Sequence, residues 1–200
     1  SSQVSCRIGT NNLQAGIKAA EAALATDDEE LYIGIVNYDV NSANGQQREL
    51  GFRQTVEQDP RVKNITTINV LSTTEDAREG AKEMLLSDSR INVVVTFNEW
   101  TSLGVGWAIR DLKRADRIQV VAFDSNVVSV GMLETGEVDA LIVQNPYAMG
   151  YLGVETAANL MNGQTGGPSV VDTATTIVTR ENMYEPESQK ILFSFEEEGY

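Results

Sequence analysis

Apolar runs of strand length recur along this chain, and each run ends at a polar residue that can hydrogen-bond a ligand. The pairs are 31–36 with Asn37, 91–97 with Asn98, 118–123 with Asp124, and 140–143 with Gln144. Continuous apolar runs of this kind are typical of strands buried on both faces of a parallel sheet. Such sheets bind ligands beyond the carboxyl ends of their strands. The pattern therefore predicts a binding site at that edge.

Segments with helical spacing of apolar residues alternate with these runs. We expect helices over 11–25, 44–58, 74–86, 100–112, 126–134 and 146–161, and further strands over 4–8, 65–71 and 170–179. Thr74, followed by two acidic residues, is predicted to begin its helix. The alternation predicts an α/β fold on an open, doubly wound parallel sheet with helices on both faces. Residues 191–200 are expected to form a poorly anchored acidic end.

Composition narrows the class of protein. The chain has 200 residues, of which 42% are hydrophobic, which is enough for a core in one or two small domains. Its net charge of −14 argues against nucleic acid and anionic membrane surfaces as partners, because these attract clustered Lys and Arg. No stretch approaches the roughly 20 apolar residues of a membrane span, and no signal peptide is evident. Cys6, the single cysteine, is expected to be a small core residue.

The commonest general base, nucleophile activator and zinc ligand is missing, and only carboxylate chemistry is left as a weak option. The chain contains no histidine, which excludes Ser-His-Asp and Cys-His catalysis. Gly104 and Gly106 lack the third glycine of a dinucleotide fingerprint and are interpreted as packing residues. Asp39, Glu99 and Asp124 offer an alternative acidic metal pocket, but they follow different strands and no lysine signature accompanies them. We therefore predict a protein that is not an enzyme and that carries no cofactor or metal.

Five stretches carry a family resemblance through their order and intervals. They are IGTNNLQAG (8–16), QRELGF (47–52), VVVTFNEWTSLG (93–104), QVVAFDS (119–125) and VDALIVQNPYAMGYLGV (138–154). Together they resemble the second half of a type I periplasmic sugar-binding protein, in the ribose-binding-protein-like group that also supplies the effector domain of LacI-type repressors. The resemblance implies two α/β lobes joined by three crossing strands, which close on a sugar like a hinge.

The resemblance also implies the ligand contacts. They fall on Arg48, Asn98 and Asp124 in the second lobe and on Gln144 at the hinge. A carboxylate accepts from adjacent hydroxyls, arginine donates in a fixed fork, and an amide does both. Each residue has an alternative interpretation. Arg48 could be a surface cation at a helix start, Asn98 and Asp124 could be helix caps, and Gln144 could be a turn residue before Pro146.

The same resemblance divides the chain. Residues 1–10 correspond to an interlobe crossing strand, 11–135 to the C-terminal lobe, 138–165 to a strand and helix of the N-terminal lobe, and 166–200 to a returning strand and tail. The earlier units of the N-terminal lobe have no counterpart, so we expect a fragment or a truncated product. The apolar stripe on 146–161 is then expected to fold onto its own lobe or to pair with another chain, for instance in a homodimer.

These observations predict the sugar-binding component of an ABC-type uptake or sensing system. Its partners would be a monosaccharide and a membrane transporter or sensor. Its location would be periplasmic or extracellular, with or without a lipid anchor. The alternative is the cytoplasmic effector-binding core of a LacI-type regulator. The stretch QNPYAMG (144–150) and the acidic charge favour the transport function.

Overall fold

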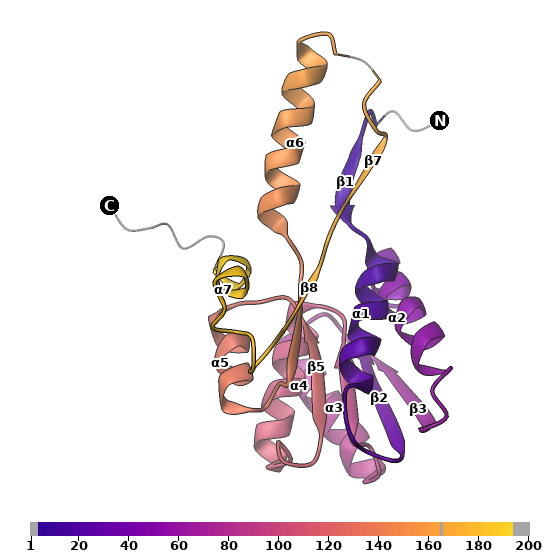
Figure 1. Ribbon diagram of the computed structural model, residues 1–200. Helices are drawn as coiled ribbons and strands as arrows, with labels where there is room; N and C mark the ends of the chain where they lie inside the picture. The colour runs from indigo at the N-terminus through magenta and orange to yellow at the C-terminus, as the bar shows by residue number, and fades with distance from the viewer. Residues whose placement is uncertain (1–3, 165, 194–200) are drawn as a thin grey trace.

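The structure is a computed structural model that describes residues 4–164 and 166–193. It has two parts of unequal size (Figure 1). The larger is a six-stranded sheet with helices on both faces, and the smaller is a two-stranded sheet with one long helix beside it. The predicted α/β class and the doubly wound parallel sheet are confirmed.

The elements alternate along the chain as expected. The strands are β1 (Arg7–Thr10), β2 (Leu31–Asn37), β3 (Val62–Asn69), β4 (Val93–Thr96), β5 (Gln119–Phe123), β6 (Ala140–Val143), β7 (Val170–Thr173) and β8 (Thr176–Thr179). The helices are α1 (Asn12–Leu24), α2 (Ala43–Val56), α3 (Thr74–Ser87), α4 (Glu99–Leu112), α5 (Val127–Thr135), α6 (Pro146–Met161) and α7 (Pro186–Leu192). Helix α3 is capped by Thr73, whose side chain accepts from the Asp76 backbone, and not by Thr74.

The large sheet has the strand order β3-β2-β4-β5-β6-β8. Its first five strands are parallel, and β8 runs antiparallel to β6. In the second sheet, β1 and β7 pair in parallel. The parallel register brings the carboxyl ends of β4, β5 and β6 to one edge, which is where the sequence predicts the site.

Two apolar clusters lie on opposite faces of the large sheet. Helices α1 and α2 cover one face, where Phe97 makes edge-to-face contacts with Phe52 and Phe123, with ring centroids 5.9 and 5.8 Å away. Helices α3, α4 and α5 cover the other face, and Leu192 of α7 joins that cluster. The buried runs of β2, β4, β5 and β6 supply apolar side chains to both clusters, as their composition predicts.

The assignment of residues 140–143 to the other lobe is wrong. Strand β6 pairs with β5 in parallel and with β8 in antiparallel fashion, inside the large sheet. All four of its residues are buried, so the strand gains most from a position covered on both faces. The pattern alone could not show which of two sheets provides that position.

The end of the chain also differs from expectation. The single strand predicted over 170–179 is two strands, because β7 pairs with β1 and the chain then crosses to the large sheet as β8. Leu192 is 6% exposed, so residues 191–193 are anchored rather than loose. The predicted tail over 194–200 lies outside the described residues. Cys6 is half-buried and is not part of the core.

Helix α6 stands apart from the large sheet and lies beside β1 (Figure 1). Its bounds agree with the predicted helix over 146–161, but none of its residues is buried. Within the described part of the chain, no helix combines the length and apolar character that a membrane span requires.

Candidate functional site

Arg48 lies at the centre of the predicted site. It is only 3% exposed on α2, so its interpretation as a surface cation is wrong. Its Nε donates to Asn12 Oδ1 at 2.9 Å, its Nη1 to the Phe97 carbonyl at 2.6 Å, and its Nη2 to Gln144 Oε1 at 2.9 Å. The guanidinium carbon also lies 4.8 Å from the centroid of the Phe123 ring. Arg48 thus ties α2 to α1, to the end of β4 and to the segment after β6.

Gln144 connects the crossing segments of the molecule. Its Oε1 accepts from Arg48 Nη2 and also from Thr10 Oγ1, at 2.7 Å, at the end of β1. Its Nε2 donates to Asp124 Oδ1 at 2.5 Å. Three of the four predicted residues are therefore joined by hydrogen bonds, and Gln144 is more than a turn residue.

Asp124 follows β5 with a φ of 67°, in the left-handed region. It does not cap α5, because Asn126 does so with a capping box, and the interpretation of Asp124 as a cap is wrong. Burial raises the pKa of Asp124, and the hydrogen bond from Gln144 and the charge of Arg48 oppose that rise. Burial likewise lowers the pKa of Arg48, against the influence of Tyr38 and Asp124. For both groups, the loss of hydrating water on burial is the largest contribution to the pKa shift.

Asn98 is the predicted residue that stays outside this network. Its Oδ1 accepts from the Thr101 backbone N–H at 2.9 Å, which makes it the N-cap of α4. Its Nδ2 donates to Ser72 Oγ at 2.8 Å. The capping interpretation is confirmed, although Asn98 directly follows Phe97, whose carbonyl accepts from Arg48.

Sequence reasoning missed two partners, Thr10 and Asn12. Thr10 is the polar last residue of β1, so a search for polar residues at the carboxyl ends of strands could have found it. Asn12 is harder to recognise, because an asparagine at a helix start usually indicates a cap. Here Asn11 is the cap, through its bond from the Gln14 backbone at 3.1 Å, and Asn12 accepts from Arg48 instead.

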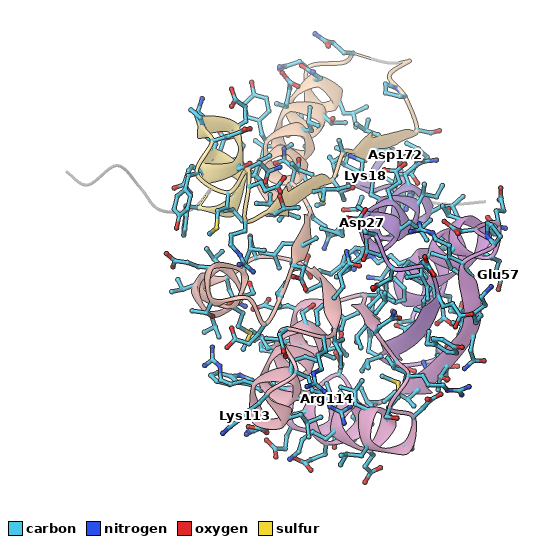
Figure 2. The ribbon with its side chains drawn as sticks, turned by 60° about the horizontal axis from the view of Figure 1, so that its bottom comes forward. Lys18, Asp27, Glu57, Lys113, Arg114 and Asp172 are labelled. Carbon is cyan, nitrogen blue, oxygen red and sulfur yellow. The ribbon has the colours of Figure 1, made fainter. Side chains whose placement is uncertain are left out.

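Polar contacts also hold the segment from β7 to β8 against the start of α1 and its cap. Lys18 Nζ donates to the Thr175 carbonyl, between β7 and β8. Asn11 Nδ2 donates to Asp172 Oδ2 at 3.0 Å, and Arg7 lies 3.7 Å from the same carboxylate. Figure 2 labels Lys18 of α1 and Asp172 of β7. These bonds place β1 and β7 relative to the large sheet.

Asp124 and Gln144 line a pocket of about 320 Å³, together with Glu99 and Met149. A larger pocket of about 1010 Å³ lies at the opposite edge of the sheet. There Gln119 donates to the Ala22 carbonyl and Asp139 accepts from the Val120 backbone, so these side chains serve the fold. Among the described residues, no cluster of His, Cys, Asp and Glu is fit to hold a metal ion. The carboxyl edge instead offers a carboxylate and an amide in the pocket, with the buried Arg48 guanidinium behind them, and such groups suit a ligand rich in hydroxyls.

An α/β lobe of this strand order, with segments that cross to a second small sheet, has the fold of the type I periplasmic binding proteins. The chain matches the family described as "Periplasmic binding protein domain" over residues 1–165. It belongs to that family, as the sequence resemblance predicts.

Known proteins similar to this chain are longer than it is. The D-ribose/D-allose-binding protein of Pseudomonas aeruginosa is 27% identical over 153 residues, which are 74% of this chain and 47% of that protein. A carbohydrate transporter solute binding protein from Agrobacterium radiobacter, solved with D-arabinose, superposes with a TM-score of 0.89 at 28% identity, covering 94% of this chain and 65% of that one. A sugar-binding protein of a sugar ABC transporter from Bacillus halodurans superposes with a TM-score of 0.86 at 28% identity, covering 92% of this chain and 67% of that one. This chain spans about half the length of the curated relative.

Proposed function

We propose that this chain supplies half of a monosaccharide site in a solute-binding protein of an ABC-type uptake or sensing system. The observation that carries the proposal is the hydrogen-bonded network of the buried Arg48 with the half-buried Gln144 and Asp124 at the carboxyl edge of the sheet. The names of the similar proteins support it, since they refer to sugar binding and transport and not to regulation or catalysis. The location would accordingly be periplasmic or extracellular, with a membrane transporter or sensor as partner.

The roles of the residues follow from their contacts. The Asp124 carboxylate would accept hydrogen bonds from neighbouring sugar hydroxyls, because it lines the pocket at the carboxyl edge and a carboxylate can accept more bonds than the one from Gln144. Arg48 would act as a positioning residue, since its three recorded bonds go to protein acceptors and fix Gln144. Asn98 would contact the ligand only by giving up its bond to Ser72.

The site would be closed by a second lobe. Strand β1, the segment from β7 to β8 and the segment from β6 to α6 connect the part that holds the large sheet with the part that holds α6 (Figure 1). Three parallel connections of this kind allow a rigid-body hinge. Because Gln144 bonds residues on β1, on α2 and directly after β5, rotation at the hinge would be coupled to the ligand contacts.

The test is a titration of pentoses and hexoses into ¹⁵N-labelled protein. We expect one class of sugar to shift the backbone amides of residues 10, 124 and 144 and to leave the rest unchanged. Asp124→Asn should weaken this response at least about tenfold, the effect of losing a charge-assisted hydrogen bond. The matched control is Asp116→Asn, whose side chain is 76% exposed near the opposite edge. Shifts that are absent, or equal in both variants, would contradict the proposal.

A further inference from the structure

Two buried threonines lie where the chain passes from the two-stranded sheet to the larger part of the molecule. Thr10 is the last residue of β1, and Thr173, the last residue of β7, is its partner in the parallel register. The chain continues from Thr10 into α1 and from Thr173 towards β8 (Figure 1). Each threonine is only 6% exposed. Both hydroxyls are therefore enclosed at the position where a hinge would turn.

The two threonine side chains share one face of the small sheet. Arg7 lies 3.7 Å from the Asp172 carboxylate on the neighbouring strand. Because side chains alternate between the faces of a strand, these two residues mark one face, and Thr10 and Thr173 lie on the other. Thr10 Oγ1 donates to Gln144 Oε1 at 2.7 Å from that face. Thr173 thus lies beside a residue that already donates to Gln144.

The hydroxyl of Thr173 has no hydrogen-bond partner among the described residues in this arrangement. Its Oγ1 is fully buried by this chain, so neither solvent nor a segment outside the described residues reaches it here. A buried hydroxyl without a partner destabilises the arrangement that holds it, and valine has nearly the same shape without that loss. A hydroxyl at this position therefore indicates a bond that forms in another arrangement.

Gln144 is the acceptor that a change of arrangement would offer to Thr173. Its Oε1 accepts from Arg48 Nη2 and from Thr10 Oγ1, and these bonds use both lone pairs of the oxygen. A third donor can bond it only by replacing one of the two. Arg48 is fixed by two further bonds, whereas Thr10 and Thr173 are cross-strand neighbours. Thr10 is therefore the donor that can be replaced.

We propose that Thr173 is a second positioning residue for Gln144, which replaces Thr10 as its donor when the two-stranded sheet turns relative to the large sheet. Gln144 then keeps two donors in both arrangements, and its amide stays directed at Asp124. This role rests on the hinge of the proposed function. Its test uses no sugar, so its outcome is independent of the sugar titration.

A double-mutant cycle in urea tests the exchange of donors. Thr173→Val should not lower the urea midpoint, because it removes an unpaired hydroxyl. Thr96→Val is the matched control and should lower it, since Thr96 is fully buried and its Oγ1 lies 2.7 Å from Ser102 Oγ. Thr10→Val should reduce the folding equilibrium constant at least about threefold more in the Thr173→Val background than in wild type, as expected for residues that share a partner.

Two further measurements locate this coupling at Gln144. Thr173→Ser retains the hydroxyl, so in this background Thr10→Val should cost no more than in wild type. In spectra of ¹⁵N-labelled protein, the Gln144 side-chain amide should shift further in the double valine variant than in Thr10→Val. A lowered midpoint for Thr173→Val, additive costs of the two valines, or equal Gln144 shifts in the single and double variants would each overturn the proposal. Circular dichroism verifies that each variant is folded.

Discussion

At the scale of single residues, the proposed site centres on the buried Arg48, the half-buried Asp124 and the Gln144 amide between them. Arg48 and Asp124 each suffer desolvation, and Gln144 uses its carbonyl towards the first and its amide towards the second. A buried polar group without a partner costs about 1–3 kcal/mol. Gln144 supplies a partner to both Arg48 and Asp124, because an amide can accept from one and donate to the other. This explains why a neutral residue lies between the two charged groups.

The raised pKa of Asp124 predicts a pH dependence. The folded chain binds this proton more tightly than the unfolded chain, so the stability contributed by the group is lost as pH rises through the folded pKa. Relative to Asp124→Asn, we expect wild-type protein to lose free energy of unfolding as pH rises from 3.8, the ordinary aspartate value, towards neutrality. Asparagine tolerates the positive φ at this position. Urea unfolding at a series of pH values measures the difference.

Asp88 provides a control of opposite sign. Hydrogen bonds from Arg90 lower the pKa of Asp88 to about 2, so its contribution is present above the unfolded pKa and lost as pH falls through the folded one. Relative to Asp88→Asn, wild-type protein should therefore lose free energy of unfolding as pH falls. Parallel curves for wild type and Asp124→Asn would contradict the assignment of a raised pKa to Asp124.

At the scale of elements, the contact of α1 with α2 sets the position of Arg48. A Cβ on Gly16 would lie 2.0 Å from the Arg48 carbonyl oxygen, and one on Gly51 would lie 2.2 Å from the Leu13 carbonyl oxygen. The two backbones thus touch at reciprocal glycines. This close approach holds Arg48 within reach of Asn12 on α1.

Gly16→Ala is expected to separate these helices. The free energy of unfolding should fall by about 1–3 kcal/mol, the usual range for overpacking, and urea denaturation monitored by circular dichroism measures it. Gly131→Ala on α5 is the control, because nothing lies within 4 Å of its added Cβ. It should stabilise the protein by up to about 1 kcal/mol through helix propensity. A neutral Gly16→Ala variant would show that the contact can relax.

At the scale of the whole molecule, stability is unevenly distributed. Both apolar clusters belong to the large sheet and its helices, whereas α6 has no buried residue. We expect hydrogen exchange in dilute protein to be at least about tenfold faster for α6 amides than for α4 amides. Local opening of α6 exposes little buried apolar surface and therefore costs little free energy. Equal protection of the two helices in monomeric protein would contradict this prediction.

Much of the fold was predictable because local chemistry decides it. The bounds of α6 agree with the sequence prediction, since Pro146 suits the first turn and the Asn145 side chain caps it. The buried runs of β2, β4, β5 and β6 were recognisable because strands covered on both faces must be apolar throughout. Asp124 and Gln144 directly follow such runs, so the pattern could predict that their side chains lie together at one edge of the sheet.

The amino-acid sequence by itself determined the class of fold, the order of its elements and the strand ends that meet at the proposed site, since these depend on the spacing and burial preference of neighbouring residues. Only the tertiary structure decided that β6 lies in the large sheet, that Thr10 and Asn12 join Arg48, and that Asn98 serves as a cap. Such outcomes depend on which distant segments meet. Thr10 and Gln144 are 134 residues apart, and a local pattern contains no information about contacts over that separation.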